Sequence, residues 1–270
     1  MITLDELTEA SDRSLAEFLA HVARTSSGGA VRQDDGMLLF AGGHNYPGAY
    51  TNGVMRLSAD VAPARLLARA DDFFGPLRRG YVVWVRDHAD GDLKDVVREA
   101  GLWQRPPEEG VAGLATDEPL RQPTAVPGLE IRRVSDDAGR LEYLRILAEG
   151  YGIEGIDEEL TAGIFCSVEC LRAENVTVLL GEVDGDAVTA GMVFMTGDTA
   201  TLQWEATVPS ARGRGIGKAV FGASCETAFE NGARLITLQS SAMATPLWTS
   251  LGVRTVTRYR RYLARPPGVR

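Results

Sequence analysis

One glycine-rich turn limits what this chain can fold into, because it joins a strand pattern directly to a helix pattern. Residues 199–208 alternate between apolar and polar side chains, which predicts a half-buried strand that ends at Pro209. Apolar residues recur at helical spacing over 216–229, and Asn231-Gly232 supplies a helix end. The turn between them reads Arg212-Gly213-Arg214-Gly215-Ile216-Gly217-Lys218.

The alternation in 199–208 assigns each strand side chain to a face. One face is expected to carry Leu202, Trp204, Ala206 and Val208, and the opposite, polar face Thr201, Gln203, Glu205 and Thr207. Glu205 is the only acid on that polar face.

A turn of this kind suits a phosphate group. Glycines let backbone N–H groups approach a ligand, and a helix start adds unpaired donors and the positive end of a dipole. A Walker loop would need glycine in place of Arg212 and Ser or Thr in place of Ala219. A dinucleotide fingerprint would need glycine in place of Lys218. A nucleotide-binding protein of another kind stays an alternative, which ATP or NAD binding would test.

The pattern that fits is Arg-x-x-Gly-x-Gly after a strand ending in Val-Pro. Here the sequence resembles the GNAT superfamily of acyl-CoA-dependent N-acetyltransferases, whose pyrophosphate loop reads Gln/Arg-x-x-Gly-x-Gly/Ala. Residues 241–253 are similar to the family's Asn-x-x-Ala-x-x-Leu-Tyr-x-x-x-Gly-Phe segment. The resemblance covers residues 129–265.

The resemblance implies acetyl-CoA as cosubstrate, without a metal ion. The pyrophosphate would lie on Arg212, Gly213, Arg214, Gly215, Ile216, Gly217 and Lys218. The backbone of Ala206, Thr207 and Val208 would hold the pantetheine arm and polarise the thioester carbonyl. Ser241, in the family's asparagine position, would bond to the same arm.

Acetyl transfer also needs a base, because the amine arrives as an ammonium ion. Glu205 is the candidate, with Gln203 orienting it or the substrate; a solvent-facing or ion-paired Glu205 is the alternative. The family's usual general acid is a tyrosine, but Trp248 stands there, and an indole cannot protonate a thiolate. Tyr259 and Tyr262 are expected to be packing residues. Either the acid is replaced, or the thiolate leaves unaided, or turnover is slow.

The element order predicts a mixed α/β (α+β) fold of two GNAT-like halves, each running strand, helix, strand, helix, strand. Residues 1–118 would form a degenerate GNAT-like domain, 119–128 a proline-containing linker, and 129–270 the N-acetyltransferase domain. The first half lacks the pyrophosphate loop, because its strand-to-helix junction at 58–63 has no glycine. Two ordinary α/β units that share an order by chance are the alternative.

Charge and composition limit the classes of partner that this chain is expected to bind. A net charge of −9 argues against nucleic acid. Three cysteines and three histidines without metal-ligand spacing predict no metal site. No signal peptide or apolar run of membrane length is seen, so a cytoplasmic protein without a membrane partner is expected, as monomer or homodimer. The acidic residues of 154–159 and the loop 42–50 are expected beside the substrate.

These features predict an N-acetyltransferase that moves an acetyl group from acetyl-CoA to a primary amine of a small molecule or peptide. Transfer is expected to be direct, within a ternary complex, because no suitably placed reactive cysteine is seen. A non-catalytic acetyl-CoA-binding regulatory or interaction module is the alternative, motivated by Trp248 and by the degenerate first half.

Overall fold

The computed structural model describes residues 2–44, 48–114, 125–152, 161, 163–241 and 244–266. Its elements are, in chain order, α1 (Leu4–Arg24), β1 (Ala30–Asp34), β2 (Met37–Ala41), β3 (Asn52–Arg56), α2 (Pro63–Phe74), β4 (Tyr81–Arg86), α3 (Gly91–Glu99), β5 (Trp103–Leu114), β6 (Leu129–Arg133), α4 (Asp137–Gly150), α6 (Val168–Leu171), β7 (Val176–Val183), β8 (Asp186–Thr196), β9 (Thr199–Thr207), η1 (Pro209–Ala211), α7 (Ile216–Glu230), β10 (Leu235–Ser241), α8 (Thr245–Thr249) and β11 (Arg254–Ala264).

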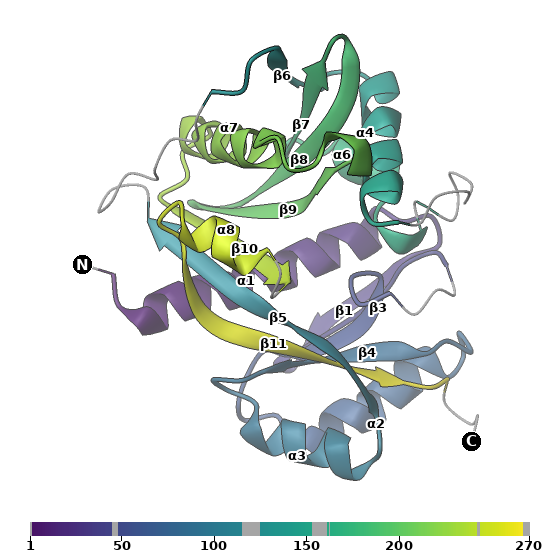
Figure 1. Cartoon of the computed structure of the whole chain (residues 1–270). Helices are drawn as coiled ribbons and strands as arrows, with labels where there is room; N and C mark the ends of the chain where they lie inside the picture. The colour runs from purple at the N-terminus through teal and green to yellow at the C-terminus, as the bar shows by residue number, and fades with distance from the viewer. Residues whose placement is uncertain are drawn as a thin grey trace.

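The strands form one mixed sheet with the order β1-β2-β3-β4-β11-β5-β10-β9-β8-β7-β6 (Figure 1). The pairs β3/β4 and β9/β10 are parallel, and the other neighbouring pairs are antiparallel. Parallel neighbours need a crossover connection, which α2 and α7 provide. The predicted mixed α/β fold class is confirmed.

Both halves contain the predicted order of strand, helix, strand, helix, strand. In the first half this order is β3-α2-β4-α3-β5, and in the second it is β9-α7-β10-α8-β11. Each begins with the parallel pair and ends with a long antiparallel strand. The repeated order therefore corresponds to a repeated sheet pattern.

The final strands of the two halves are exchanged. β5 lies between β11 and β10, and β11 lies between β4 and β5 (Figure 1). The parallel pair of each half is thus extended by a strand from the other half. Hydrogen bonds of the sheet consequently interlock the predicted halves 1–118 and 129–270. The linker 119–128 stays a prediction, because residues 115–124 lie outside the described part of the chain.

Helix α1 also joins the two halves, since it lies across the middle of the sheet (Figure 1). It begins after the N-cap Thr3, whose side chain accepts a hydrogen bond from the backbone N–H three residues later. Leu15 lies in one apolar cluster with Trp84 of β4. Phe18 packs edge-on against Trp204 of β9, with ring centroids 5.0 Å apart. The hydrophobic core is therefore shared between the halves.

The described residues show neither a membrane-spanning helix nor a metal-binding cluster. No helix of the described residues combines the length and the apolar character that crossing a bilayer requires. Within the described ranges, no group of three or more His, Cys, Asp or Glu side chains is placed to hold a metal ion.

Candidate active site

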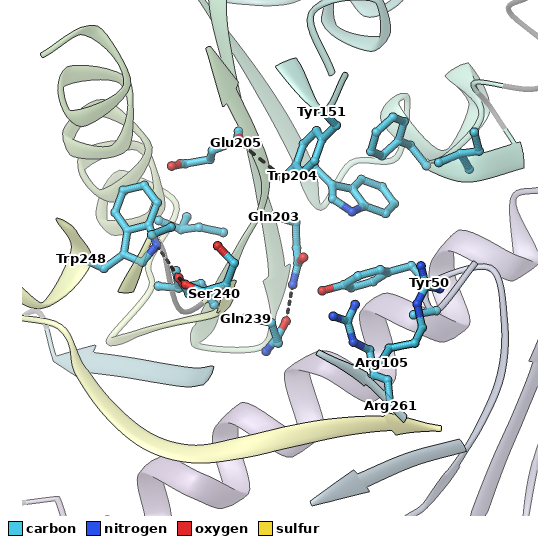
Figure 2. Close-up of a pocket in the computed structure, with 17 residues that line it drawn as sticks. Tyr50, Arg105, Tyr151, Gln203, Trp204, Glu205, Gln239, Ser240, Trp248 and Arg261 are labelled. Atoms are coloured by element: carbon cyan, nitrogen blue, oxygen red, sulfur yellow. Dashed lines mark hydrogen bonds between the residues drawn. The ribbon is translucent and has the colours of Figure 1, made fainter. Parts of the chain in front are cut away.

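A cavity opens where β9 and β10 separate. Their parallel pairing ends at Leu202 and Leu238. One residue further along, Gln203 Nε2 donates a hydrogen bond to Gln239 Oε1 at 2.5 Å. Around and beyond this pair lies a cavity of about 280 Å³ (Figure 2). The parting of two parallel strands therefore creates a site between them.

Both halves of the chain line this cavity. Glu205 of β9 and Trp248 of α8 come from the second half, and Tyr50 and Arg105 come from the first. Of the loop 42–50, Ala49 and Tyr50 line the cavity, and its contact with the substrate stays a prediction. The predicted acidic residues Glu154, Asp157, Glu158 and Glu159 lie outside the described residues.

A bulge in β9 shapes the wall of the cavity. Gly191 of β8 lies opposite two residues of β9, Trp204 and Glu205, so β9 contains one extra residue. Trp204 has a φ of 47°, which is uncommon for a residue with a side chain. Beyond the bulge the alternation of faces is shifted by one residue. Glu205 therefore lies on the α7 side of the sheet, as Leu202 does.

This shift corrects the predicted faces of the strand. Trp204 was expected on the apolar face with Leu202, but it packs on the opposite side, against α1. Glu205 was expected to share a face with Thr201, whose hydroxyl lies 2.9 Å from that of Thr237, on the α1 side. Period-two spacing assumes a regular strand, so it cannot show where an extra residue is inserted.

The carboxyl group of Glu205 is enclosed between β9 and α7. Both of its oxygen atoms are buried and make no hydrogen bond to a described residue, so it is neither solvent-facing nor ion-paired within that part. Burial raises the pKa of Glu205 to about 8, and the neighbouring Ser224 hydroxyl offsets only part of that rise. Gly191 leaves the necessary room, because a Cβ there would lie 3.2 Å from Glu205 Oε1. Such a group exchanges its proton near neutral pH.

The glycine-rich turn forms the start of α7, as predicted. Gly213 and Gly215 have φ values of 77° and 80°, which favour glycine. The N-cap residue of α7 is Gly215, which has no side chain to cap the helix, so backbone N–H groups of the first turn are available to a ligand. The Arg212 guanidinium turns back, donating to the carbonyls of Thr207 (3.1 Å) and Gly150. Its side chain thus ties the turn to β9 and α4.

The side chains of the turn differ in exposure. Arg214 is exposed and Lys218 is half-buried, so both can reach a bound anion. Ile216 is buried in the core and can offer only its backbone. A Cβ on Gly217 would lie 2.9 Å from Thr207 Oγ1, so glycine lets the helix start close to the strand end. The turn therefore combines backbone donors with two cations.

At the end of β9, some backbone groups face β8 and others face the side of β10. Val208 N–H donates to Val188 at 2.9 Å, and its carbonyl accepts from Ala211. Backbone groups alternate between the edges of an antiparallel strand, so those of Thr207 face the edge that β10 leaves open. The carbonyl of Thr207 accepts from Arg212 Nε at 3.1 Å, and that of Ala206 accepts from Thr189 Oγ1 at 2.9 Å. Of the three residues predicted to hold the pantetheine arm, Thr207 is thus the best placed through its backbone N–H, which faces the open edge.

A sequence match to a family model spans this site. Residues 142–253, from within α4 to the residue before β11, match the family model described as the acetyltransferase (GNAT) family. The chain carries a GNAT acetyltransferase domain. This match supports an acyltransferase activity with acetyl-CoA as cosubstrate. No curated protein matches the chain.

Solved structures extend the likeness beyond the GNAT domain to nearly the whole chain. A GCN5-related N-acetyltransferase from Kribbella flavida has a TM-score of 0.72 at 18% identity, over 96% of each chain. One from Sphaerobacter thermophilus has a TM-score of 0.66 at 13% identity, over 95% of this chain and 93% of that chain. A tandem GNAT protein from the clavulanic acid biosynthesis pathway has a TM-score of 0.60 at 14% identity, over 96% and 97%. At this level of sequence identity, the similarities show a shared fold and nothing further.

The acid position of the GNAT domain holds an indole. Trp248 Nε1 donates to Ser240 Oγ at 2.9 Å, and its ring stacks on Phe221 of α7 with centroids 4.4 Å apart. Tyr259 and Tyr262 are fully buried, which agrees with their predicted packing role. Ser241, like Trp248, lines the cavity, and its bond to a cofactor arm stays a prediction.

Two arginines at the cavity were not predicted. Arg105 of β5 and Arg261 of β11 both line it, and they are directly opposed in the β5/β11 pairing. Arg105 comes from the first half and Arg261 from the last strand. Arg105 lies far from the GNAT domain motifs in sequence, whereas Arg261 follows the segment 241–253 by eight residues, so the exchange of strands is what brings the two side by side. No local sequence signal could have identified them.

The corresponding cleft of the N-terminal half is filled by charged side chains. The parallel pairing of β3 and β4 ends at Met55 and Trp84. The next residue, Arg56, is 1% exposed and donates from Nε to Asp90 at 2.8 Å. Its Nη1 and Nη2 donate to Asp92. An ion-paired arginine thus lies where the GNAT domain has its cavity.

Proposed function

We propose that the chain transfers an acetyl group from acetyl-CoA to a primary amine of a small molecule or peptide, within one ternary complex. The observation that carries the proposal is the cavity between β9 and β10, with the buried carboxyl group of Glu205 in its wall. The same strand leads directly into the glycine-rich turn. A candidate base and a candidate phosphate site therefore lie at successive points of one element.

Acetyl-CoA fits the residues of this site. The uncapped start of α7 offers backbone N–H groups to the pyrophosphate, and Arg214 and Lys218 add positive charge. Thr207 offers its backbone N–H to the pantetheine arm at the open edge of β9. When bound, acetyl-CoA supplies a thioester carbonyl that an amine can attack. Backbone donors at that edge would stabilise the negative charge that develops on the carbonyl oxygen.

Glu205 has the properties that the base requires. As a carboxylate it takes a proton from the ammonium group, directly or through one water molecule. The amine nitrogen then forms the new C–N bond while the C–S bond breaks, and the second proton that nitrogen loses passes to the departing thiolate or to water. The thiolate leaves with the bonding electron pair, and because a thiol has a pKa of about 8.5, it can leave without a protein acid. This agrees with an indole at position 248.

The direct test measures release of free CoA thiol from acetyl-CoA with a panel of primary amines. We expect amine-dependent release in the wild type and a loss of about a hundredfold in Glu205→Gln, since general base catalysis contributes on that order. CoA affinity should be unchanged in this variant, which keeps the size of the side chain. An acetylated protein trapped in the absence of amine would contradict direct transfer.

Trp248 favours one other candidate function, a module that binds acetyl-CoA without catalysing transfer. Its indole N–H is already donated to Ser240, so it offers nothing to a leaving thiolate. Tight acetyl-CoA binding without amine-dependent thiol release would support this candidate. In that case Trp248→Tyr, which introduces a phenol, should produce turnover, whereas Trp248→Phe should not.

A further inference from the structure

The end of the cavity near the N-terminal half is cationic. Arg105 and Arg261 lie on the same side of the Gln203–Gln239 pair, whereas Glu205 lies on the other side (Figure 2). Both arginines are half-buried. Glu205 is the only acid among the described residues that line the cavity. The cavity thus has Glu205 in its wall at one end and two guanidinium groups at the other.

The two guanidinium groups are held at this end by the fold. Arg261 Nη2 donates to the carbonyl of Pro106 at 2.8 Å, and its guanidinium lies 5.9 Å from the ring centroid of Trp84. Arg105 is opposed to it across β5 and β11. An anion bound between the two guanidinium groups would be stabilised by both.

The chemistry of the ligand follows from this geometry. Arginine presents planar pairs of N–H donors that match the two oxygens of a carboxylate. A cavity of about 280 Å³ is at the small end of ligand sites, which suits a compact molecule better than a folded protein surface. A ligand that places an amine near Glu205 would reach the arginines with an acidic group.

We propose that Arg105 and Arg261 bind a carboxylate of the acetyl acceptor, so that the acceptor is a small amine that also carries a carboxylate. This inference rests on the proposed function, because it assigns the amine end of the ligand to Glu205. It also makes the N-terminal half part of the acceptor site, since Arg105 and Tyr50 belong to that half.

The kinetic test compares matched amines with and without the acidic group. Thiol release is measured with 4-aminobutanoate, its methyl ester and butylamine. We expect kcat/KM for the carboxylate to exceed both others by about tenfold or more, the worth of one charge-assisted hydrogen bond. Arg105→Gln and Arg261→Gln should each reduce this ratio towards one, mainly through KM. Arg261→Lys, which keeps the charge but not the planar donor pair, should retain part of it.

The control variant is Arg254→Gln. Arg254 is an exposed arginine of β11 that does not line the cavity, so the same change in charge on the same strand should leave the ratio unaltered. Amine-dependent release that is equal for the three amines would overturn the carboxylate site and leave the proposed function standing. Faster turnover of 3-aminopropyl phosphate than of 4-aminobutanoate would also overturn the assignment to a carboxylate.

A binding measurement tests whether the two arginines bind the carboxylate, even if the protein shows no turnover. Calorimetry of 4-aminobutanoate into protein saturated with CoA, which cannot transfer an acetyl group, reports the acceptor site alone. We expect binding in the wild type and in Arg254→Gln, and a loss of about tenfold in each arginine variant that keeps the wild-type urea midpoint. Equal affinity in all four proteins, or no binding in the wild type, would overturn the inference.

Discussion

Arg56 occupies in the N-terminal half the register position that Gln203 occupies in the C-terminal half. Each is the first residue after the last parallel pair, Met55 with Trp84 in one half and Leu202 with Leu238 in the other. Gln203 bonds to a second glutamine beside an open cavity, whereas Arg56 fills the equivalent place and binds two aspartates. One repeated framework therefore holds a site in one half and a buried ion network in the other.

Arg56→Gln should destabilise the chain by about 3 to 5 kcal/mol, because it breaks the pair with the fully buried Asp90. The matched control is Asp92→Asn, which removes the other partner of Arg56. The Asp92 side chain is 57% exposed, so we expect a cost below about 1 kcal/mol. Urea unfolding followed by circular dichroism measures both. Equal losses in the free energy of unfolding would show that burial does not make the ion pair with Asp90 stronger than the one with Asp92.

The filled cleft also predicts the stoichiometry of cofactor binding. We expect calorimetry to find one acetyl-CoA per chain, because the N-terminal junction at 58–63 has no glycine and Arg56 fills the adjoining cleft. A second binding event of similar affinity would contradict this assignment of the two halves.

Gly215→Ala should weaken CoA binding by about tenfold, since a Cβ at a φ of 80° strains the turn that offers N–H groups to the pyrophosphate. Gly232→Ala is a matched control, because Gly232 follows the same helix at its other end with a φ of 90°. Each variant should lose about 1 to 2 kcal/mol of stability. Only Gly215→Ala should have a lower affinity for CoA. Neither variant should have a lower affinity for pantetheine that lacks the phosphates. Equal loss for both ligands would indicate general misfolding.

The pKa of Glu205 predicts the pH dependence of turnover. The base must be ionised, so kcat/KM should rise with pH through about 8 when the acceptor amine titrates near 10. Glu205→Gln should remove the part of the rise in kcat/KM that is centred near pH 8. The part that comes from deprotonation of the acceptor amine should remain. An identical profile in the variant would exclude Glu205 as the base.

The same group predicts a pH dependence of stability. The pKa of Glu205 is raised on folding, so the unfolded chain releases the proton at lower pH than the folded chain does. The free energy of unfolding should therefore fall as pH rises from about 4.5 to 8. Glu205→Gln should show a smaller fall and exceed the wild type in stability above pH 8. Urea titrations at several pH values measure this difference.

Exchange of β5 and β11 predicts that the halves unfold together. The N-terminal half contains Trp84 and Trp103, and the C-terminal half contains Trp204 and Trp248. Variants that keep only one pair, with phenylalanine at the other positions, report each half by fluorescence. We expect the two midpoints in urea to coincide within each variant with the loss of far-UV circular dichroism. A half that unfolds first would contradict the interlocked sheet.

The strand, turn and helix around 212–218 could be read from the sequence, because they depend on local interactions. Glycine positions, the proline that ends the strand and the helical spacing after it all act within about 30 residues. The repeated order of elements was predictable for the same reason. The structure confirms both, down to the left-handed φ values of Gly213 and Gly215.

The sequence predicted Glu205 as the base because of its expected place on the polar face of the strand, and the structure shows that this place was wrong. The strand pattern placed it on a polar face with Thr201, but the bulge at Trp204 turns its carboxyl group beneath α7. Its raised pKa comes from that burial, which depends on packing between α7 and β9. A periodic pattern contains no information on an inserted residue or on the helix above it.

By itself the sequence determined the elements of each half, the glycine-rich start of α7 and the absence of such a turn at 58–63, since backbone preference acts between neighbours. Only the tertiary structure decided which strands lie side by side. The exchange of β5 and β11 brings Arg105 to Arg261, 156 positions apart in the chain, and sets both at the cavity that Glu205 lines. Such pairing depends on the hydrogen bonds and buried apolar area of the whole sheet, which no local stretch of residues specifies.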